Sequence, residues 1–228
     1  MFIVFDIDDT LIDHASAEHQ AARLFWRRYA ATLPQTEVEF PQAWHDAAEF
    51  HFGAFLRGEC VYQEQRRRRI RTFFGDALSD AEADAIFNIY AAGYESSWQL
   101  FPDVLPCLDG LREHDHTLSI ISNNGQTQSR EKLDHMGLLD RFVDVVTPDM
   151  AGVSKPDPGI FALAGERLKA DPQQCVYVGD KLTSDARGAA GAGWRGVWVN
   201  RNGADSAGVN DVIVIDDLRA LVDRVNSA

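Results

Sequence analysis

Cysteine, lysine and long apolar runs are all scarce in this 228-residue sequence. Its three cysteines, Cys60, Cys107 and Cys175, lie far apart and form no CxxC pair, so we expect reduced thiols that act as small core residues in a cytoplasmic protein. The apolar run at the N-terminus is too short for a signal peptide and is ended by acids, and no stretch approaches the length of a membrane span. We therefore expect a soluble protein that has no membrane partner.

The shortage of positive charge narrows the choice of partners further. The formal net charge is −13 at pH 7, and so negative a body is repelled by nucleic acid and by anionic membranes. An anionic substrate would need local cations to attract it. Apolar residues make up 45% of the chain and charged residues 25%, which is ordinary globular composition; the length allows one large domain or a domain with a smaller insert.

The first residues of the chain predict a buried strand that is followed directly by acidic residues. Residues 2–5 are all apolar, as in a strand covered on both faces, and Asp6 and Asp8 follow directly. In an open parallel sheet this end of the strand faces the ligand crevice, and residues two apart point the same way. The two carboxylates would converge and repel each other unless a cation binds them, and oxygen ligands favour Mg²⁺ over zinc. The alternative is an acidic turn in which Asp9 or Thr10 caps a helix.

Residues 14–97 differ in character from the rest of the chain. They are rich in Ala, Glu, Gln, Arg and aromatic residues, and apolar positions such as Ala21 and Phe25 recur at helical spacing. Breaks at proline and glycine divide the segment into four or five helices with no convincing strand. We expect an inserted helical domain here, with residues 1–13 and 98–228 forming the other domain.

Strands and helices alternate from residue 101 onward. Elements of these lengths are typical of a parallel sheet with helices on both faces. The predicted fold class is α/β, with a Rossmann-like doubly wound parallel core and an inserted α-helical domain. The expected elements are helices at 104–114, 127–136, 158–168 and 184–190, a final helix after 215, and strands at 117–121, 142–146, 175–178, 196–199 and 212–215.

Two loops that follow predicted strands add groups suited to an anion. Ser122 and Asn123 lead into a helix N-terminus, whose free N–H groups and dipole favour a phosphate. An Asn-Gly turn with serine as the helix cap explains the same residues. Lys155 is one of only four lysines, and the prolines that follow it restrict where it can move. A surface lysine of no special role is the alternative.

A third stretch adds two acids at the same edge of the sheet. Asp180 ends a predicted strand, and Asp185 falls in the first turn of the next helix, where the helix dipole favours an acid. An ordinary helix cap explains Asp185 alone. It does not explain why Asp180 arrives opposite Asp6 and Asp8.

Together these motifs resemble those of the haloacid dehalogenase superfamily of aspartate-nucleophile phosphatases. They occur in the family's order, and four motifs in register are far more specific than any one. The dehalogenases proper lack the second acid, so Asp8 favours phosphoester chemistry, while Asp9 stands where many relatives have glycine. The helical insert corresponds to the family's cap. The matching stretches are Asp6–Thr10, Ser122-Asn123, Lys155 with its prolines, and Gly179-Asp180 with Asp185.

The resemblance implies a role for each of these residues. Asp6, ionised at neutral pH with an ordinary pKa of about 3.9, would attack phosphorus and form an aspartyl-phosphate. Asp8 would protonate the leaving alcohol and then deprotonate the attacking water. Mg²⁺ would be bound by the Asp6 carboxylate, the Asp8 backbone carbonyl and Asp180, and Asp185 would orient a metal-bound water or Lys155. The phosphoryl oxygens would be held by Ser122, Asn123 and Lys155, with Thr10 in support.

The enzyme implied is a Mg²⁺-dependent phosphatase that acts on a small phosphorylated metabolite. An Asp-Asp-Thr opening with a helical cap of this size resembles nucleoside 5′-monophosphate phosphatases, so a nucleotidase is the first candidate. Sugar-phosphate and phosphoglycolate phosphatases come next. A phosphomutase on the same scaffold and a binding protein without turnover stay open as alternatives.

Three other patterns lead to no site prediction. Residues 191–196 fit GxGxxG but precede a strand, which favours a tight helix-to-strand turn over nucleotide binding. The arginines of residues 66–71 are expected to form a mostly solvated helix face; the alternative is that one of them steers an anionic substrate. Trp26, Trp44 and Trp98 are expected to pack inside the helical domain, although they could stack on a base or sugar.

Overall fold

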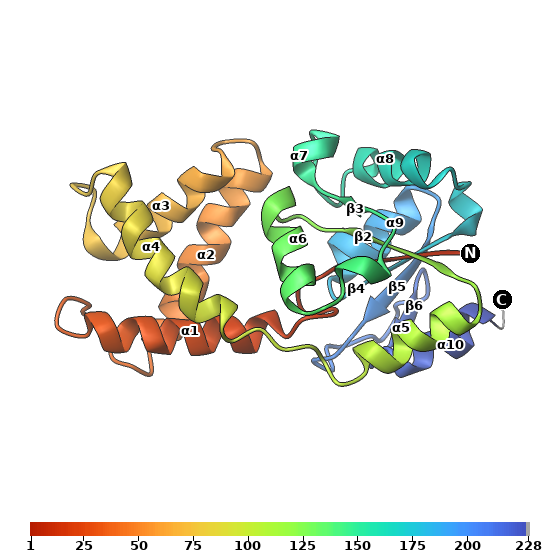
Figure 1. Cartoon of the computed structure of the whole chain (residues 1–228), viewed down its shortest axis with the longest axis horizontal. Coiled ribbons are helices and arrows are strands. Elements are labelled where there is room, and N and C mark those ends of the chain that lie inside the picture. Colours follow the sequence, from red (N-terminus) through yellow and green to blue (C-terminus); the bar gives the residue numbers. More distant parts are fainter. Residues whose placement is uncertain (227–228) are drawn as a thin grey trace. The chain divides into compact units, whose positions relative to one another are not determined.

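The computed structural model describes residues 1–226 and divides into two compact units (Figure 1). One unit consists of Met1–Asp13 together with the described chain from Leu100 onward, and the other is His14–Gln99. The second unit begins at the predicted residue and ends at Gln99 instead of residue 97. No helix within residues 1–226 is long and apolar enough to cross a membrane.

A parallel sheet of six strands forms the centre of the first unit. Its order is β3-β2-β1-β4-β5-β6. Strands β2 and β3 are added on one side of β1, and β4 to β6 are added on the other side, so the strand order reverses between β1 and β4. This confirms the doubly wound α/β fold. The strands are β1 (Phe2–Phe5), β2 (Thr117–Ile121), β3 (Val145–Val146), β4 (Cys175–Gly179), β5 (Arg195–Val199) and β6 (Ile213–Ile215).

Helices cover both faces of this sheet. Figure 1 shows α5 and α10 on one side and α8 and α9 on the other. Val4, Tyr177 and Phe161 belong to one buried core cluster that also includes residues of α8 and α9, which explains why the strands are apolar without alternation. The helices are α5 (Val104–Glu113), α6 (Gln126–His135), α7 (Pro148–Ala151), α8 (Pro158–Leu168), α9 (Gly188–Gly191) and α10 (Arg219–Asn226).

Two predicted elements differ from the structure. The strand expected at 142–146 is reduced to β3, because a 3₁₀ turn at Leu139–Arg141 precedes it and Val143 is 66% exposed. The helix expected at 184–190 starts earlier, as a π-helical turn at Leu182–Arg187 that continues into α9. The carbonyl of Lys181 accepts from the N–H groups of residues 185 and 186, which widens the turn.

The glycine-rich stretch at 191–196 is a tight connection from α9 to β5. Gly193 has a φ of +82°, which favours glycine. A Cβ on Gly196 would lie 2.0 Å from the carbonyl oxygen of Ala186. These close approaches account for the glycines, as the helix-to-strand interpretation predicted.

The second unit contains four helices among its described residues. Trp44 is fully buried, and its ring centroid lies 4.2 Å from that of Tyr90 and 5.2 Å from that of Phe25. Trp98 is also buried, so these two tryptophans pack in the core as expected. The helices are α1 (His14–Tyr29), α2 (Phe40–Leu56), α3 (Tyr62–Phe74) and α4 (Asp80–Glu95).

The arginines of residues 66–71 on α3 are partly exposed except for the buried Arg69, so the expected mostly solvated face is confirmed only in part. Arg67 pairs with Asp84 and Asp80, both at 2.7 Å, and Arg71 pairs with Asp80 at 2.6 Å. Arg69 is buried, with its guanidinium 5.5 Å from the centre of the Trp44 ring. The acids that bind Arg67 and Arg71 come from α4, which α3 contacts, and a helical period alone does not reveal that neighbour.

Candidate active site

Two acids lie together at the ends of β1 and β4, the neighbouring strands between which the strand order reverses. Asp6 directly follows β1 and Asp180 directly follows β4, and the strands pair with Phe5 opposite Val178. The N–H of Asp6 donates to the carbonyl of Val178 at 2.9 Å, which extends the pairing to the acid itself. Strand register therefore explains why Asp6 and Asp180 meet at this sheet edge. The predicted convergence of the Asp8 carboxylate with that of Asp6 is wrong, because Asp8 is bound by Lys132 and Asn124 and is not part of the acid cluster.

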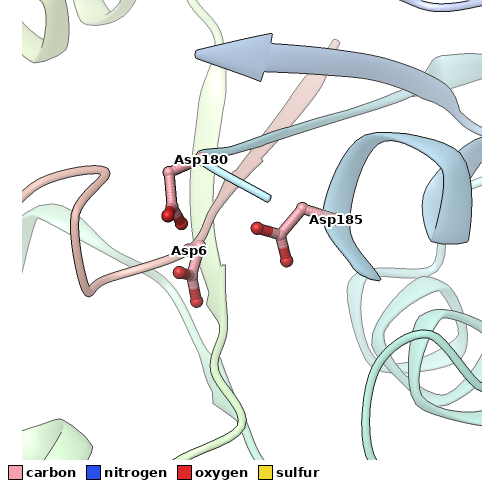
Figure 2. Close-up of side chains that lie close together, drawn as sticks. All are labelled: Asp6, Asp180 and Asp185. Carbon is pink, nitrogen blue, oxygen red and sulfur yellow. The ribbon is translucent and has the colours of Figure 1, made fainter. Parts of the chain in front are cut away.

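Asp185 reaches the same place from the π-helical turn. Figure 2 shows the carboxylates of Asp6, Asp180 and Asp185 facing a common space, and one oxygen of each lies within 4.8 Å of the others. Asp185 is buried, and its Oδ2 accepts from the N–H of Lys181 at 2.9 Å. A Cβ on Gly179 would lie 2.5 Å from the Asp185 side chain, so glycine at the end of β4 permits this approach.

Lys155 connects two of these acids. Its Nζ lies 2.7 Å from Asp6 Oδ1 and 2.8 Å from Asp185 Oδ1, and it donates to the hydroxyl of Tyr177 at 2.6 Å. That hydroxyl donates in turn to the carbonyl of Ile121 at 2.7 Å. The ammonium group is therefore fixed by three partners inside the protein, and sequence reasoning missed Tyr177 because it looks like any other residue of a buried strand.

Asn123 holds the backbone of Lys155. Its Oδ1 accepts from the Lys155 N–H at 2.8 Å, and its Nδ2 donates to the Lys155 carbonyl at 3.0 Å. These bonds use the amide oxygen and one N–H of Nδ2, so the predicted contact of Asn123 with phosphoryl oxygens would come from the second N–H of Nδ2 or from the backbone N–H. The side chain also positions the lysine loop.

Ser122 and Thr10, two further predicted site residues, are both buried. Ser122 follows β2, and its Oγ accepts from the N–H of Asn124 at 3.2 Å. The Thr10 hydroxyl is buried without a hydrogen-bond partner among residues 1–226, and its carbonyl accepts from Arg201 at 2.8 Å. The roles predicted for Ser122 and Thr10 remain predictions.

The acids carry more negative charge than Lys155 can balance. Burial raises the pKa of Asp6 to about 6 although the Lys155 charge opposes this, and burial together with the charges of Asp6 and Asp185 raises the pKa of Asp180 to about 8. Burial lowers the pKa of Lys155, but Asp185 and Asp6 outweigh it and hold that pKa well above its usual value. Lys155 therefore remains an ammonium group, but its single charge does not balance the acids: a pKa of about 8 keeps Asp180 mostly protonated at pH 7 until a further cation binds.

These residues fit a hard divalent cation. One carboxylate oxygen of Asp180, Oδ1, is buried and has no hydrogen-bond partner in the described chain. The indole N–H of Trp198 donates to the Asp180 carbonyl at 2.8 Å and helps to fix this residue. Mg²⁺ would match both the oxygen-only ligands and the missing positive charge.

Asp8 lies in a different environment from Asp6. Lys132 Nζ donates to Asp8 Oδ1 at 2.5 Å, and Asn124 Nδ2 donates to Asp8 Oδ2 at 2.6 Å. Sequence reasoning missed both donors. Lys132 lies on the buried face of α6 with Ser129 and Leu133, and a lysine on such a face is the signal that could have indicated a buried partner.

Comparison with known proteins agrees with the fold and the motifs. The chain belongs to the haloacid dehalogenase-like hydrolases, whose family model matches residues 1–193. A glyceraldehyde 3-phosphate phosphatase of Methanopyrus kandleri is 30% identical over 202 residues, covering 87% of this chain and 83% of the relative. A phosphoserine phosphatase of Thermus thermophilus is 35% identical over 227 residues, covering 87% and 88%.

A solved structure shows a second chemistry on a similar fold. The crystal structure of a 2-haloacid dehalogenase from Pseudomonas syringae pv. Tomato is 29% identical to this chain and superposes with a TM-score of 0.73, covering 100% of this chain and 99% of the other. The protein is therefore a hydrolase, and the choice between phosphate and halide chemistry has to be argued from its own residues.

Proposed function

We propose that this protein is a Mg²⁺-dependent phosphatase that hydrolyses a small organic phosphomonoester through an aspartyl-phosphate formed on Asp6. The observation that carries the proposal is the presence of two acids, Asp6 and Asp8, in separate surroundings. Asp6 lies with Lys155 and the candidate metal ligands, whereas Asp8 is held by Lys132 and an amide. These separate surroundings allow the two acids different roles, and we propose attack for Asp6 and proton transfer for Asp8.

Asp6 is able to act as the nucleophile without a base. Its pKa of about 6 leaves it mostly ionised at pH 7, and the contact with Lys155 Nζ orients one of its oxygens. Lys155 would also offset the charge on the phosphoryl oxygens. Bound Mg²⁺, held by Asp6, Asp180 and the Asp8 carbonyl, would supply further positive charge against the same oxygens.

Asp8 would move the proton in both halves of the reaction. As the bond from Asp6 to phosphorus forms and the ester P–O bond breaks, Asp8 gives its proton to the leaving alkoxide. It then takes a proton from the water that attacks the aspartyl-phosphate, which releases inorganic phosphate and regenerates Asp6. A halide leaves without being protonated, so the presence of Asp8 supports a phosphomonoester over a haloacid as substrate.

Small phosphorylated metabolites are the proposed substrate class. The names of the two relatives, a glyceraldehyde 3-phosphate phosphatase and a phosphoserine phosphatase, support small phosphomonoesters and do not point to nucleotides in particular. A nucleoside 5′-monophosphate remains a candidate only through the Asp-Asp-Thr opening and the size of the helical unit. We propose that this unit serves as a cap that selects the leaving group.

Phosphate release from a substrate panel tests the proposal. The panel contains glyceraldehyde 3-phosphate, phosphoserine, phosphoglycolate, sugar phosphates and nucleoside 5′-monophosphates, each assayed with Mg²⁺ and with chelator. We expect metal-dependent release that Asp6→Asn lowers by roughly 10³-fold or more, while the exposed Asp140→Asn leaves it unchanged. Wild-type protein that releases no phosphate from any of them would refute the phosphatase and return the choice to a mutase or a binding protein.

A further inference from the structure

We infer that Lys132 and Asn124 are positioning residues that hold Asp8 in place for proton transfer, an inference that rests on the proposed phosphatase function. Each donates to a different oxygen of the Asp8 carboxylate, at 2.5 and 2.6 Å. Two donors on two oxygens fix both the rotation of the carboxylate and the direction of the side chain. A carboxylate oxygen has two lone pairs, so each oxygen keeps a position from which a proton can be exchanged.

The backbone at Asp8 does not provide this order by strand packing. The residue lies beyond β1 in a turn in which the N–H groups of Leu11 and Ile12 both donate to the carbonyl of Ile7. Its side chain is 23% exposed, whereas that of Asp6 is 11% exposed. A carboxylate on such a turn would sample several rotamers in the absence of fixed partners, and a general acid must stay within hydrogen-bond reach of the leaving oxygen.

The burial of Lys132 needs a partner of opposite charge. Lysine is almost never fully buried unless it is paired, yet Lys132 is 1% exposed and its ion pair with Asp8 joins residues 124 apart in the chain. Arg130, on the same helix, is exposed. The sequence thus places a cation on the buried face of α6, where it reaches Asp8.

One segment of the chain orients both Lys155, which contacts the proposed nucleophile, and Asp8, the proposed proton donor. The loop after β2 supplies Asn123, which holds the backbone of Lys155, and Asn124, which holds Asp8. The helix that follows, α6, supplies Lys132. Lys155 and Asp8 are therefore held by adjacent residues of the loop between β2 and α6, which keeps their relative placement constant.

The loss of a residue that positions Asp8 should depend on the leaving group of the substrate. An alkoxide must be protonated as it departs, whereas p-nitrophenolate is stable enough to leave without a proton. A residue that acts by positioning Asp8 will therefore affect kcat/KM for alkyl phosphates, which includes the leaving-group step, far more than kcat/KM for p-nitrophenyl phosphate. A residue that only supports the fold will affect both substrates alike.

The test compares Lys132→Met with Arg130→Met, which removes one positive charge from the exposed side of the same helix. With saturating Mg²⁺, kcat/KM is measured for phosphoserine, glyceraldehyde 3-phosphate and p-nitrophenyl phosphate. We expect Lys132→Met to lower kcat/KM for the alkyl phosphates by about 100-fold, the lower end of the usual contribution of general acid catalysis. The loss with p-nitrophenyl phosphate should stay within about fivefold, and Arg130→Met should match the wild type with every substrate.

A second variant guards against misfolding. Asn124→Ala, at a half-buried loop position, should show the same leaving-group selectivity at a smaller magnitude, and it decides the question if Lys132→Met does not fold. Equal losses with alkyl and aryl phosphates in the variants that fold would overturn the inference while leaving the phosphatase intact. The phosphatase itself fails separately, if Asp6→Asn retains wild-type release.

Discussion

Replacing Gly179 with alanine would push a methyl carbon into the Asp185 side chain. The new Cβ would lie 2.5 Å from the Cβ, Cγ and Oδ2 atoms of Asp185, closer than any relaxed contact allows. Asp185 is buried and bonded to both Lys155 and the Lys181 N–H, so it cannot move without breaking those contacts. Overpacking of this kind costs about 1–3 kcal/mol of folding free energy, and the displaced carboxylate would release Lys155 from one of its partners.

Gly191 provides the matched control for this substitution. It is the last residue of α9, whereas Gly179 is the last residue of β4, and a Cβ on Gly191 would meet nothing within 4 Å. We expect Gly179→Ala to lower the urea midpoint by about 1 M, taking 2 kcal/mol and an m-value of about 2 kcal/mol/M, and to weaken Mg²⁺ binding measured by calorimetry. Gly191→Ala should leave both quantities nearly unchanged. If Gly179→Ala keeps the wild-type midpoint and Mg²⁺ affinity, the close packing of β4 against Asp185 is not what holds the acid in place.

Two further predictions concern charge. Arg201→Met would leave the 2% exposed Asp103 carboxylate without its bidentate partner and should lower the free energy of unfolding, measured in urea, by about 3 kcal/mol. Arg187→Met, which removes an exposed ion pair with Asp211, should lower it much less. Equal losses in the two variants would contradict this prediction. Because the pKa of Asp180 is about 8 when folded without metal and 3.8 ordinarily, the folded state binds more protons between these values. Stability of the metal-free protein should therefore fall as pH rises from about 4 to 8, and the Mg²⁺-induced rise in Tm should be larger at pH 8 than at pH 6; an equal rise at both would argue against Asp180 as a ligand.

The parallel sheet and the acids at its edge could be predicted from the amino-acid sequence alone. Continuous apolar runs mark buried strands, and polar residues directly after such runs lie at the carboxyl edge in any doubly wound sheet. Asp6 and Asp180 directly follow β1 and β4 and could therefore be predicted as neighbours. The contact between Lys155 and Asp185 was implied by the family resemblance, not by this pattern. The helix-to-strand turn at the GxGxxG pattern could be predicted because its position before a strand is a local property, and the structure confirms that turn.

The partner of each polar group, in contrast, depends on how distant elements pack and could not be predicted from the sequence. Lys132 pairs with Asp8, 124 residues away in the chain, and the Asn123 side chain bonds the Lys155 backbone. The local spacing of residues predicts neither contact. The arginines of α3 read as a solvated face because a helical period shows which residues share a side of the helix, not that α4 supplies the acids beside them. Periodicity reports the local backbone, whereas ion pairs between distant residues depend on how the packed elements meet.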